Sequence, residues 1–362
     1  MLAHHHRLDR AYGFDSLVVC AFNKGAYGKS GPMCLGLTGL STISDLRRKF
    51  SRLIHQHQPQ TVIYHNLWGC HSLCDLDHAR RRIGFIHTDS APMREVIARD
   101  AGTLDGIIAV SAPIADFAAS VWPEPDRIRQ ISYPVACPPE FSSLHPAWHE
   151  PFRLGYCGRL LIEQKRVDRL PEAWKKLRAI FPDAVLEILG EGAERKKLEK
   201  SWLAEKDVLF RGRLTGDDYW RTLSNWDAII FSSDYEGTPI SLLEAMNAGV
   251  LPVYPVTGSG GDDYVRKLSP ALLYRHDDAD SLPAVFQWLK SRSSGEIFLL
   301  RQKARELVAA LSLENYFRQF TSCLADFGAM PPVARPRVAG TPWLPARIPF
   351  GFWSRKFSSV MP

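Results

Sequence analysis

Two glutamates eight residues apart, Glu236 and Glu244, lie in the segment EGTPISLLEAMNAG. Within it, Thr238 is a favourable N-cap, Pro239 suits the first helical position, and Gly249 suits the end of a helix. The pattern predicts a helix whose first backbone N–H groups are free to bind an anion such as a phosphate. Glu236 would lie in the loop before that helix.

Glu244 has two interpretations. Most glutamates on helices are solvated, and Glu236 could simply cap a loop. However, Glu244 lies in an apolar run with Leu242, Leu243 and Met246, where an unpaired charge would be costly. We therefore expect Glu244 to have a polar partner.

A second candidate segment, GRLLIEQKRVDRL at residues 158–170, places Arg159 and Lys165 in a loop after an apolar run. The planar fork of an arginine and the point charge of a lysine could together hold a diphosphate. An ordinary solvated basic loop is the alternative, because such loops are common. The two segments together favour a binding site.

The elements that position these residues follow one repeated pattern. Short apolar, β-rich runs alternate with helical stretches, such as the helix that begins at Ser44 with Leu46, Phe50, Leu53 and Ile54 on one face. The apolar runs lie at residues 17–20, 61–65, 82–87, 105–111, 152–158, 185–190, 207–212, 227–233 and 250–254. Strands that are apolar throughout and separated by helices predict parallel sheets covered on both faces.

Prolines crowd the middle of the chain and divide this pattern in two. We predict an α/β fold of two Rossmann-like, doubly wound domains facing a cleft, into which the carboxyl ends of both sheets point. The predicted units are an N-terminal domain (1–137), a linker (138–151), a C-terminal domain (152–310), a closing helix (311–327) and a tail (328–362).

Composition excludes several classes of protein. The chain has 362 residues, a net charge of +6 and seven scattered cysteines, which argues against a disulfide framework and favours the cytoplasm. Asp326 is the last acidic residue, and five of the six net positive charges lie in the tail that follows it. The rest of the chain is therefore nearly neutral, and no nucleic-acid partner is expected. No secretory signal opens the chain, and residues 1–10 read as a helix.

The tail interleaves aromatic and basic residues between prolines. This composition suits an anionic membrane surface, and with it a peripheral location on the inner face of the membrane. A disordered tail without a partner is an equally good interpretation.

A cluster of potential metal ligands lies at Cys70, His71, Cys74, Asp75, Asp77 and His78. Its C-x3-C spacing matches no usual structural zinc pattern, and the segment reads as a helix with mixed faces. We expect no metal site there.

In combination, these motifs resemble the retaining glycosyltransferases of the GT-B fold, in family 4 of the group 1 transferases. The resemblance rests on GR…K after the first strand of the second domain, on the G-x-G of Gly190 and Gly192, and on the E-x7-E motif. It covers most of residues 152–256. The N-terminal half of the chain resembles the family mainly at the ends of its predicted strands, in IHTD at 86–89 and DGIIAVS at 105–111.

The resemblance implies a role for each matching position. Arg159 and Lys165 would contact the diphosphate of the sugar donor, and Glu244 its ribose. Glu236 would act electrostatically on the transferred sugar, and His87 would lie on the acceptor side, although a histidine in the core is the alternative. The implied donor-binding residues are Gly158, Arg159, Lys165, Gly190, Gly192, Gly237, Thr238, Pro239, Ile240 and Glu244, with Glu236 and His87 as catalytic residues.

The resemblance therefore implies a metal-independent retaining enzyme without a cofactor. It would move a hexose from a nucleotide-diphosphate sugar to a glycan or lipid-linked acceptor, in cell-surface polysaccharide or lipopolysaccharide synthesis. The family also opens with a strand and a glycine-rich turn that are not found before Phe14. A truncated, non-catalytic nucleotide-sugar-binding protein is thus the alternative. The related epimerases and phosphorylases fit less well.

Overall fold

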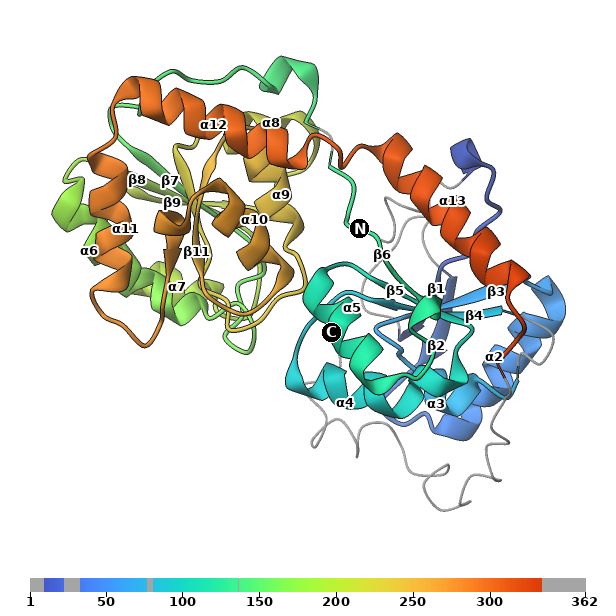
Figure 1. Ribbon diagram of the computed structural model, residues 1–362. Helices are drawn as coiled ribbons and strands as arrows, with labels where there is room; N and C mark the ends of the chain where they lie inside the picture. The colour runs from blue at the N-terminus through green and yellow to red at the C-terminus, as the bar shows by residue number, and fades with distance from the viewer. Residues whose placement is uncertain (1–9, 23–32, 77–80, 136, 334–362) are drawn as a thin grey trace.

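The computed structural model describes residues 10–22, 33–76, 81–135 and 137–333. Its strands form parallel sheets of two, four and six strands. Helices and strands gather into an N-terminal lobe and a C-terminal lobe (Figure 1). The predicted α/β class, with parallel sheets in two Rossmann-like units, is confirmed.

The six-stranded sheet of the C-terminal lobe has the order β12-β11-β10-β7-β8-β9. Its strands are β7 (Arg153–Cys157), β8 (Val185–Leu189), β9 (Val208–Gly212), β10 (Ala228–Ile230), β11 (Leu251–Pro255) and β12 (Leu273–Tyr274). The chain moves outward from β7 to β9 and then returns to the other side of β7 with β10. This reversal makes a topological switch point between β7 and β10, where sheets of this kind bind ligands beyond the carboxyl ends of their strands.

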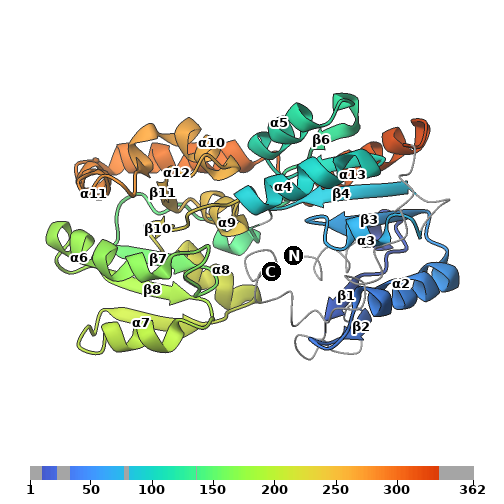
Figure 2. The same cartoon turned by 90° about the horizontal axis from the view of Figure 1, so that it is seen from below.

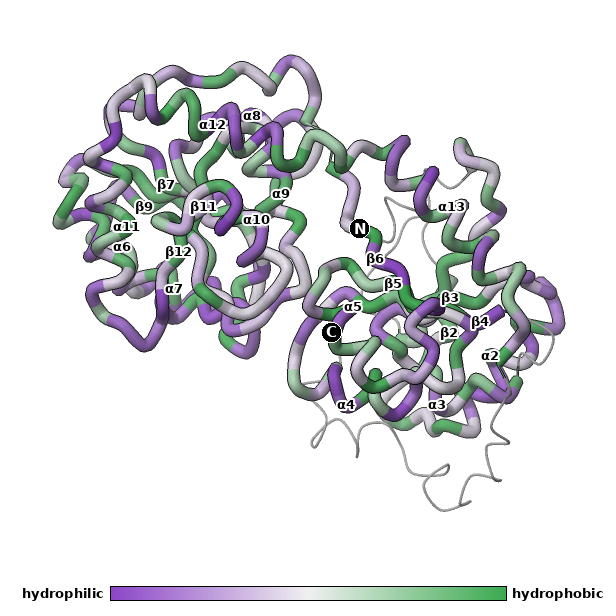
Figure 3. The backbone as a smooth tube through the Cα atoms, in the orientation of Figure 1, coloured by the Kyte–Doolittle hydropathy of each residue, from purple (hydrophilic) through white to green (hydrophobic). Residues whose placement is uncertain are grey.

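Helices lie on both sides of this sheet (Figure 2). They are α6 (Leu170–Ile180), α7 (Arg195–Ser201), α8 (Gly216–Ser224), α9 (Ile240–Asn247), α10 (Gly260–Leu268), α11 (Ser281–Lys290) and α12 (Ser294–Val308). At the centre of the sheet, the fully buried ring of Trp226 covers Gly155 of β7 so closely that a Cβ atom there would lie 1.9 Å from the indole. Apolar residues line the strands inside each lobe (Figure 3).

The described strands of the N-terminal lobe form two sheets. A pair, β1 (Val19–Phe22) with β2 (Met33–Leu37), lies apart from a four-stranded sheet in the order β3-β4-β5-β6. The strands of the second sheet are β3 (Thr61–His65), β4 (Arg81–Ile86), β5 (Gly106–Ala109) and β6 (Ile128–Gln130). The helices of this lobe are α2 (Ile43–His57), α3 (Cys70–Leu73), α4 (Ala91–Asp100) and α5 (Ala112–Val121).

Several sequence-based boundaries need correction. The strand predicted at 17–20 begins at Val19, and β2, β6 and β12 were not predicted. β6 and β12 are short and β6 is polar, whereas β2 is only partly buried and contains a glycine. On α2, Leu46 and Phe50 are buried, whereas the other two predicted face residues are half-buried. The helix predicted around the cysteine cluster covers only Cys70–Leu73 among the described residues. Residues 1–9, 77–80 and 334–362 lie outside the described residues, and with them most of the predicted first helix and of the tail.

The last helix, α13 (Leu313–Ala329), lies on the N-terminal lobe, whereas α12 lies on the C-terminal lobe (Figure 1). Its buried Phe327 packs on Gly106 of β5, where a Cβ atom would lie 2.5 Å from the ring. Beyond the helix, the backbone N–H of Val333 donates to Asp105 Oδ1 at 2.9 Å. The end of the described chain is therefore part of the N-terminal core. No helix among the described residues is long and apolar enough to cross a membrane.

We expect Phe327→Ala to lower the free energy of unfolding by about 3–5 kcal/mol, because the ring is fully buried against a glycine that cannot fill the space. Urea denaturation measures this value. The matched control is Phe298→Ala, because Phe298 on α12 is 40% exposed. Equal losses in the two variants would contradict the packing of α13 described above.

Candidate active site

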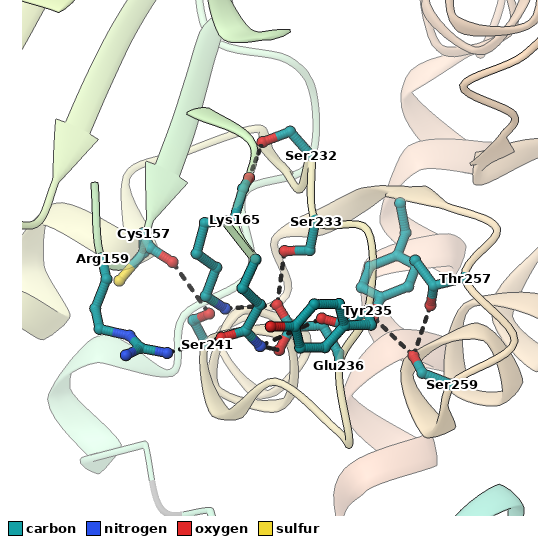
Figure 4. A network of polar contacts seen from close by, with 12 residues as sticks. Cys157, Arg159, Lys165, Ser232, Ser233, Tyr235, Glu236, Ser241, Thr257 and Ser259 are labelled. Atoms are coloured by element: carbon teal, nitrogen blue, oxygen red, sulfur yellow. Dashed lines mark hydrogen bonds and ion pairs between the residues drawn. The ribbon is translucent and has the colours of Figure 1, made fainter. Parts of the chain in front are cut away.

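The carboxyl ends of β7 and β10 carry the predicted cations and the first predicted glutamate. Arg159 and Lys165 lie in the segment between β7 and α6, and Glu236 lies between β10 and α9. Their side chains converge in one polar network (Figure 4). The residues predicted as one site from separate motifs thus meet at the topological switch point.

The carboxylate of Glu236 is held by three hydrogen-bond donors from both segments. Lys165 Nζ lies 2.5 Å from Glu236 Oε1, and Ser233 Oγ donates to the same oxygen at 2.6 Å. Gln164 Nε2 donates to Glu236 Oε2 at 3.1 Å. Because Glu236 is only 5% exposed, this ion pair and these hydrogen bonds fix a nearly buried charge at one place.

Gln164 connects this carboxylate to Arg159. Its Oε1 accepts a hydrogen bond from Arg159 Nη2 at 2.7 Å, while its Nε2 also donates to the carbonyl oxygen of Tyr235 at 3.2 Å. Sequence reasoning missed Gln164 and Ser233. Each lies within three residues of a predicted site residue, but no spacing rule shows that the two segments meet.

The predicted glycines allow two loops to touch through their backbones. Gly190, after β8, has φ +144°, and a Cβ atom there would lie 1.8 Å from the carbonyl oxygen of Gly158. A Cβ atom on Gly192 would lie 2.2 Å from the carbonyl oxygen of Leu160. The G-x-G motif therefore has a structural reason here, because it lets the loop that carries Arg159 lie against the loop after β8.

The helix predicted after Glu236 is present as α9, but its cap differs from the prediction. Pro239 is the N-cap and Ile240 the first helical residue, so the assignment of Thr238 as N-cap was wrong. The Thr238 hydroxyl is buried without a hydrogen-bond partner in the described part of the chain, and it lies against Gly260. The N–H groups at the start of a helix carry positive potential, and in α9 that of Leu242 donates to the carbonyl oxygen of Pro239 at 3.1 Å. Gly249, with φ +77°, follows the end of α9.

Glu244 has the polar partner that was expected. Tyr219 on α8 donates its phenolic hydrogen to Glu244 Oε2. Burial raises the pKa of Glu244 to about 7, and the hydrogen bond from Tyr219 opposes part of this shift. The sequence did not identify Tyr219, because it lies on another helix, 25 residues from Glu244 along the chain.

His87 lies directly after β4, where the two lobes touch. A Cβ atom on Gly237 would lie 2.2 Å from the carbonyl oxygen of His87, and the backbone N–H of Asp89 donates to the carbonyl oxygen of Glu236 at 3.3 Å. The His87 ring contacts His65 Nδ1 at 2.7 Å and the Tyr133 hydroxyl at 2.5 Å. The predicted acceptor-side histidine is thus brought next to the loop that carries Glu236.

Among the described residues, no group of three histidine, cysteine or acidic side chains is placed to hold a metal ion. Asp77 and His78 of the cysteine cluster lie outside the described part.

Comparisons with known proteins agree with this architecture. Residues 144–305 match the family model of glycosyl transferases group 1. These residues belong to the group 1 glycosyltransferases. The matched segment holds Arg159, Lys165, Glu236 and Glu244, whereas His87 lies outside it.

Individual relatives resemble parts of the chain. The GtfA subunit of the UDP-N-acetylglucosamine–peptide N-acetylglucosaminyltransferase of Streptococcus agalactiae is 30% identical over 108 residues, 29% of this chain and 21% of that protein. The matched stretch spans about a fifth of the length of the curated relatives it matches. These matches cover part of the chain only, so they indicate a group 1 domain and do not establish the activity of the whole chain.

Solved structures show the same fold. HepE of Anabaena, in complex with UDP and glucose, has a TM-score of 0.68 at 16% identity, covering 88% of this chain and 94% of that chain. WaaG, a glycosyltransferase involved in lipopolysaccharide biosynthesis, has a TM-score of 0.64 at 16% identity, covering 89% and 94%. The chain therefore has the GT-B fold of these structures.

We expect the affinity for a nucleoside diphosphate sugar to fall as the pH drops below about 7. Protonation of Glu244 removes the carboxylate that would accept hydrogen bonds from ribose, and its pKa is raised to about 7. Calorimetric titration between pH 5.5 and 8.5 measures the dependence. In Glu244→Gln this part of the pH dependence should vanish. A pH-independent affinity in the unsubstituted protein would contradict the role of Glu244.

Proposed function

We propose that the protein is a retaining, metal-independent hexosyltransferase of family 4, in which a nucleoside diphosphate sugar binds between the loops after β7 and β10. The observation that carries this proposal is the convergence of Lys165, Glu236 and the first turn of α9 at the switch point of the sheet. An anionic diphosphate and a polar sugar are the ligand groups that such a set of charges suits.

The positive groups would act where negative charge develops. Breaking the bond between the sugar C1 and the diphosphate oxygen leaves an oxocarbenium-like sugar and a more negative leaving group. Arg159, Lys165 and the N–H groups of α9 would stabilise that leaving group, a task that a metal ion performs in other enzymes. No metal is required in this scheme.

No side chain is needed as a base to remove the proton of the acceptor hydroxyl. The acceptor hydroxyl oxygen forms a bond to C1 on the face that the diphosphate leaves, and its proton passes to the departing phosphate oxygen. Attack from the same face retains the configuration at C1. Glu236, fixed by Lys165, Ser233 and Gln164, would stabilise and orient the sugar without forming a bond to it.

For the acceptor, we propose a glycan or a lipid-linked saccharide of cell-surface polysaccharide or lipopolysaccharide synthesis. The similarity to WaaG, whose name places it in lipopolysaccharide biosynthesis, supports this assignment. Contact with an anionic membrane surface, and with it a peripheral location at the inner face of the membrane, stays a prediction from the tail. Residues 334–362 of that tail lie outside the described part.

We expect the protein to bind one of UDP-, GDP- or ADP-hexose saturably. Lys165→Ala should weaken that binding at least tenfold, because it removes the positive charge that would contact the diphosphate. Calorimetric titration measures the affinities. Lys175→Ala is the matched control, because Lys175 is exposed on α6 and should leave the affinity unchanged. A folded protein that binds none of these sugars would refute the proposed donor site.

We expect Glu236→Gln to reduce turnover by about 10²–10³-fold while the affinity for the sugar donor changes by less than about fivefold, because the carboxylate acts on charge that appears in the transition state. Release of nucleoside diphosphate in the presence of a panel of saccharide acceptors measures turnover. If the unsubstituted protein binds a sugar donor but transfers to no acceptor, the non-catalytic alternative is favoured.

A further inference from the structure

Three ring side chains of the N-terminal lobe form one chain of hydrogen bonds beside the proposed site. His87, after β4, lies between His65 at the end of β3 and Tyr133 after β6. Its Nε2 is 2.7 Å from His65 Nδ1, and its Nδ1 is 2.5 Å from the Tyr133 hydroxyl. Both ring nitrogens of His87 are therefore engaged by the protein.

The geometry of the rings favours strong hydrogen bonds. The planes of His65 and His87 are within 16° of each other, and those of His87 and Tyr133 within 7°. The ring centres of the two histidines are 5.0 Å apart, although their nitrogens are much closer, so the rings meet edge to edge. The lone pair and the N–H bond of an imidazole lie in the ring plane, where these contacts are made.

Tyr133 sets the direction of the hydrogen bonds. It is 4% exposed, and burial raises the pKa of its phenol well above the usual value, so the hydroxyl keeps its hydrogen. In the described part of the chain, His87 Nδ1 is the acceptor that this hydroxyl meets. A buried hydroxyl that does not donate is costly, so Tyr133 donates, and the hydrogen on His87 must be on Nε2.

We propose that Tyr133 and His65 are positioning residues that hold His87 in its neutral tautomer with the hydrogen on Nε2. His65 Nδ1 accepts that hydrogen and thereby orients the ring. Both ring nitrogens of His87 are then used within this chain of rings, so the side chain does not act as a base beside the loop of Glu236 and Gly237. Its importance for turnover rests on the proposed function, but the tautomer does not.

Nitrogen NMR of protein labelled with ¹⁵N-histidine tests the tautomer directly. Long-range proton–nitrogen spectra distinguish a protonated from an unprotonated ring nitrogen, and the signals of His87 are assigned by their loss in His87→Gln. We expect an unprotonated Nδ1 and a protonated Nε2 in the unsubstituted protein. A hydrogen on Nδ1 would overturn the proposal, and this spectrum decides the matter even if the Tyr133 or His65 variants fail to fold.

Variants test the two positioning residues. Tyr133→Phe removes the donor to His87 Nδ1 but leaves His65 as the acceptor of the Nε2 hydrogen, so we expect the Nδ1 signal to shift as it loses its hydrogen bond, and kcat to fall about tenfold, with the KM for the sugar donor within twofold of its original value. His65→Leu should lower kcat similarly, whereas His65→Asn, whose amide oxygen can replace Nδ1 as acceptor, should restore most of it. An unshifted Nδ1 signal in Tyr133→Phe, or equal losses in the two His65 variants, would overturn the proposal.

The proposed function can fail separately from this inference. If the unsubstituted protein binds no nucleoside diphosphate sugar, the sugar-donor site is refuted, while the spectrum of His87 is still measured and still decides the tautomer.

Discussion

The ion pair between Lys165 and Glu236 joins the two sides of the switch point. One partner follows β7 and the other follows β10, and both side chains are largely buried. Removing one partner would leave an uncompensated charge in a poorly solvated place, which is strongly unfavourable. The two segments are therefore held together wherever this pair is intact, and with them Gln164, Arg159 and the start of α9.

This pair also prepares the site for a ligand before any ligand arrives. Gln164 and Ser233 also donate to Glu236, so the carboxylate is oriented before a ligand arrives. Lys165 and the first turn of α9 supply positive potential from two directions. A site built in this way is suited to separating charge between a sugar and a diphosphate, since the stabilising groups already lie in place.

The sequence predicted the parallel α/β architecture and the motif positions, because apolar strands, glycines and helix signals are local features. The strand at 61–65 was correct to the residue. The cap of α9 was wrong, because Thr238 turns toward Gly260, a contact with α10 that no local pattern contains. Gln164, Tyr219, His65 and Tyr133 were missed for the same reason, since their roles arise from contacts between distant segments.

Hydrogen–deuterium exchange with and without a nucleoside diphosphate sugar at saturating concentration tests directly whether this ligand binds at the switch point of the sheet. We expect slower exchange in residues 158–166 and 232–243, which surround the Lys165–Glu236 pair, and little change in α11 or α2. Protection confined to regions away from β7 and β10, with exchange unaltered in those two segments, would contradict a ligand site at the switch point.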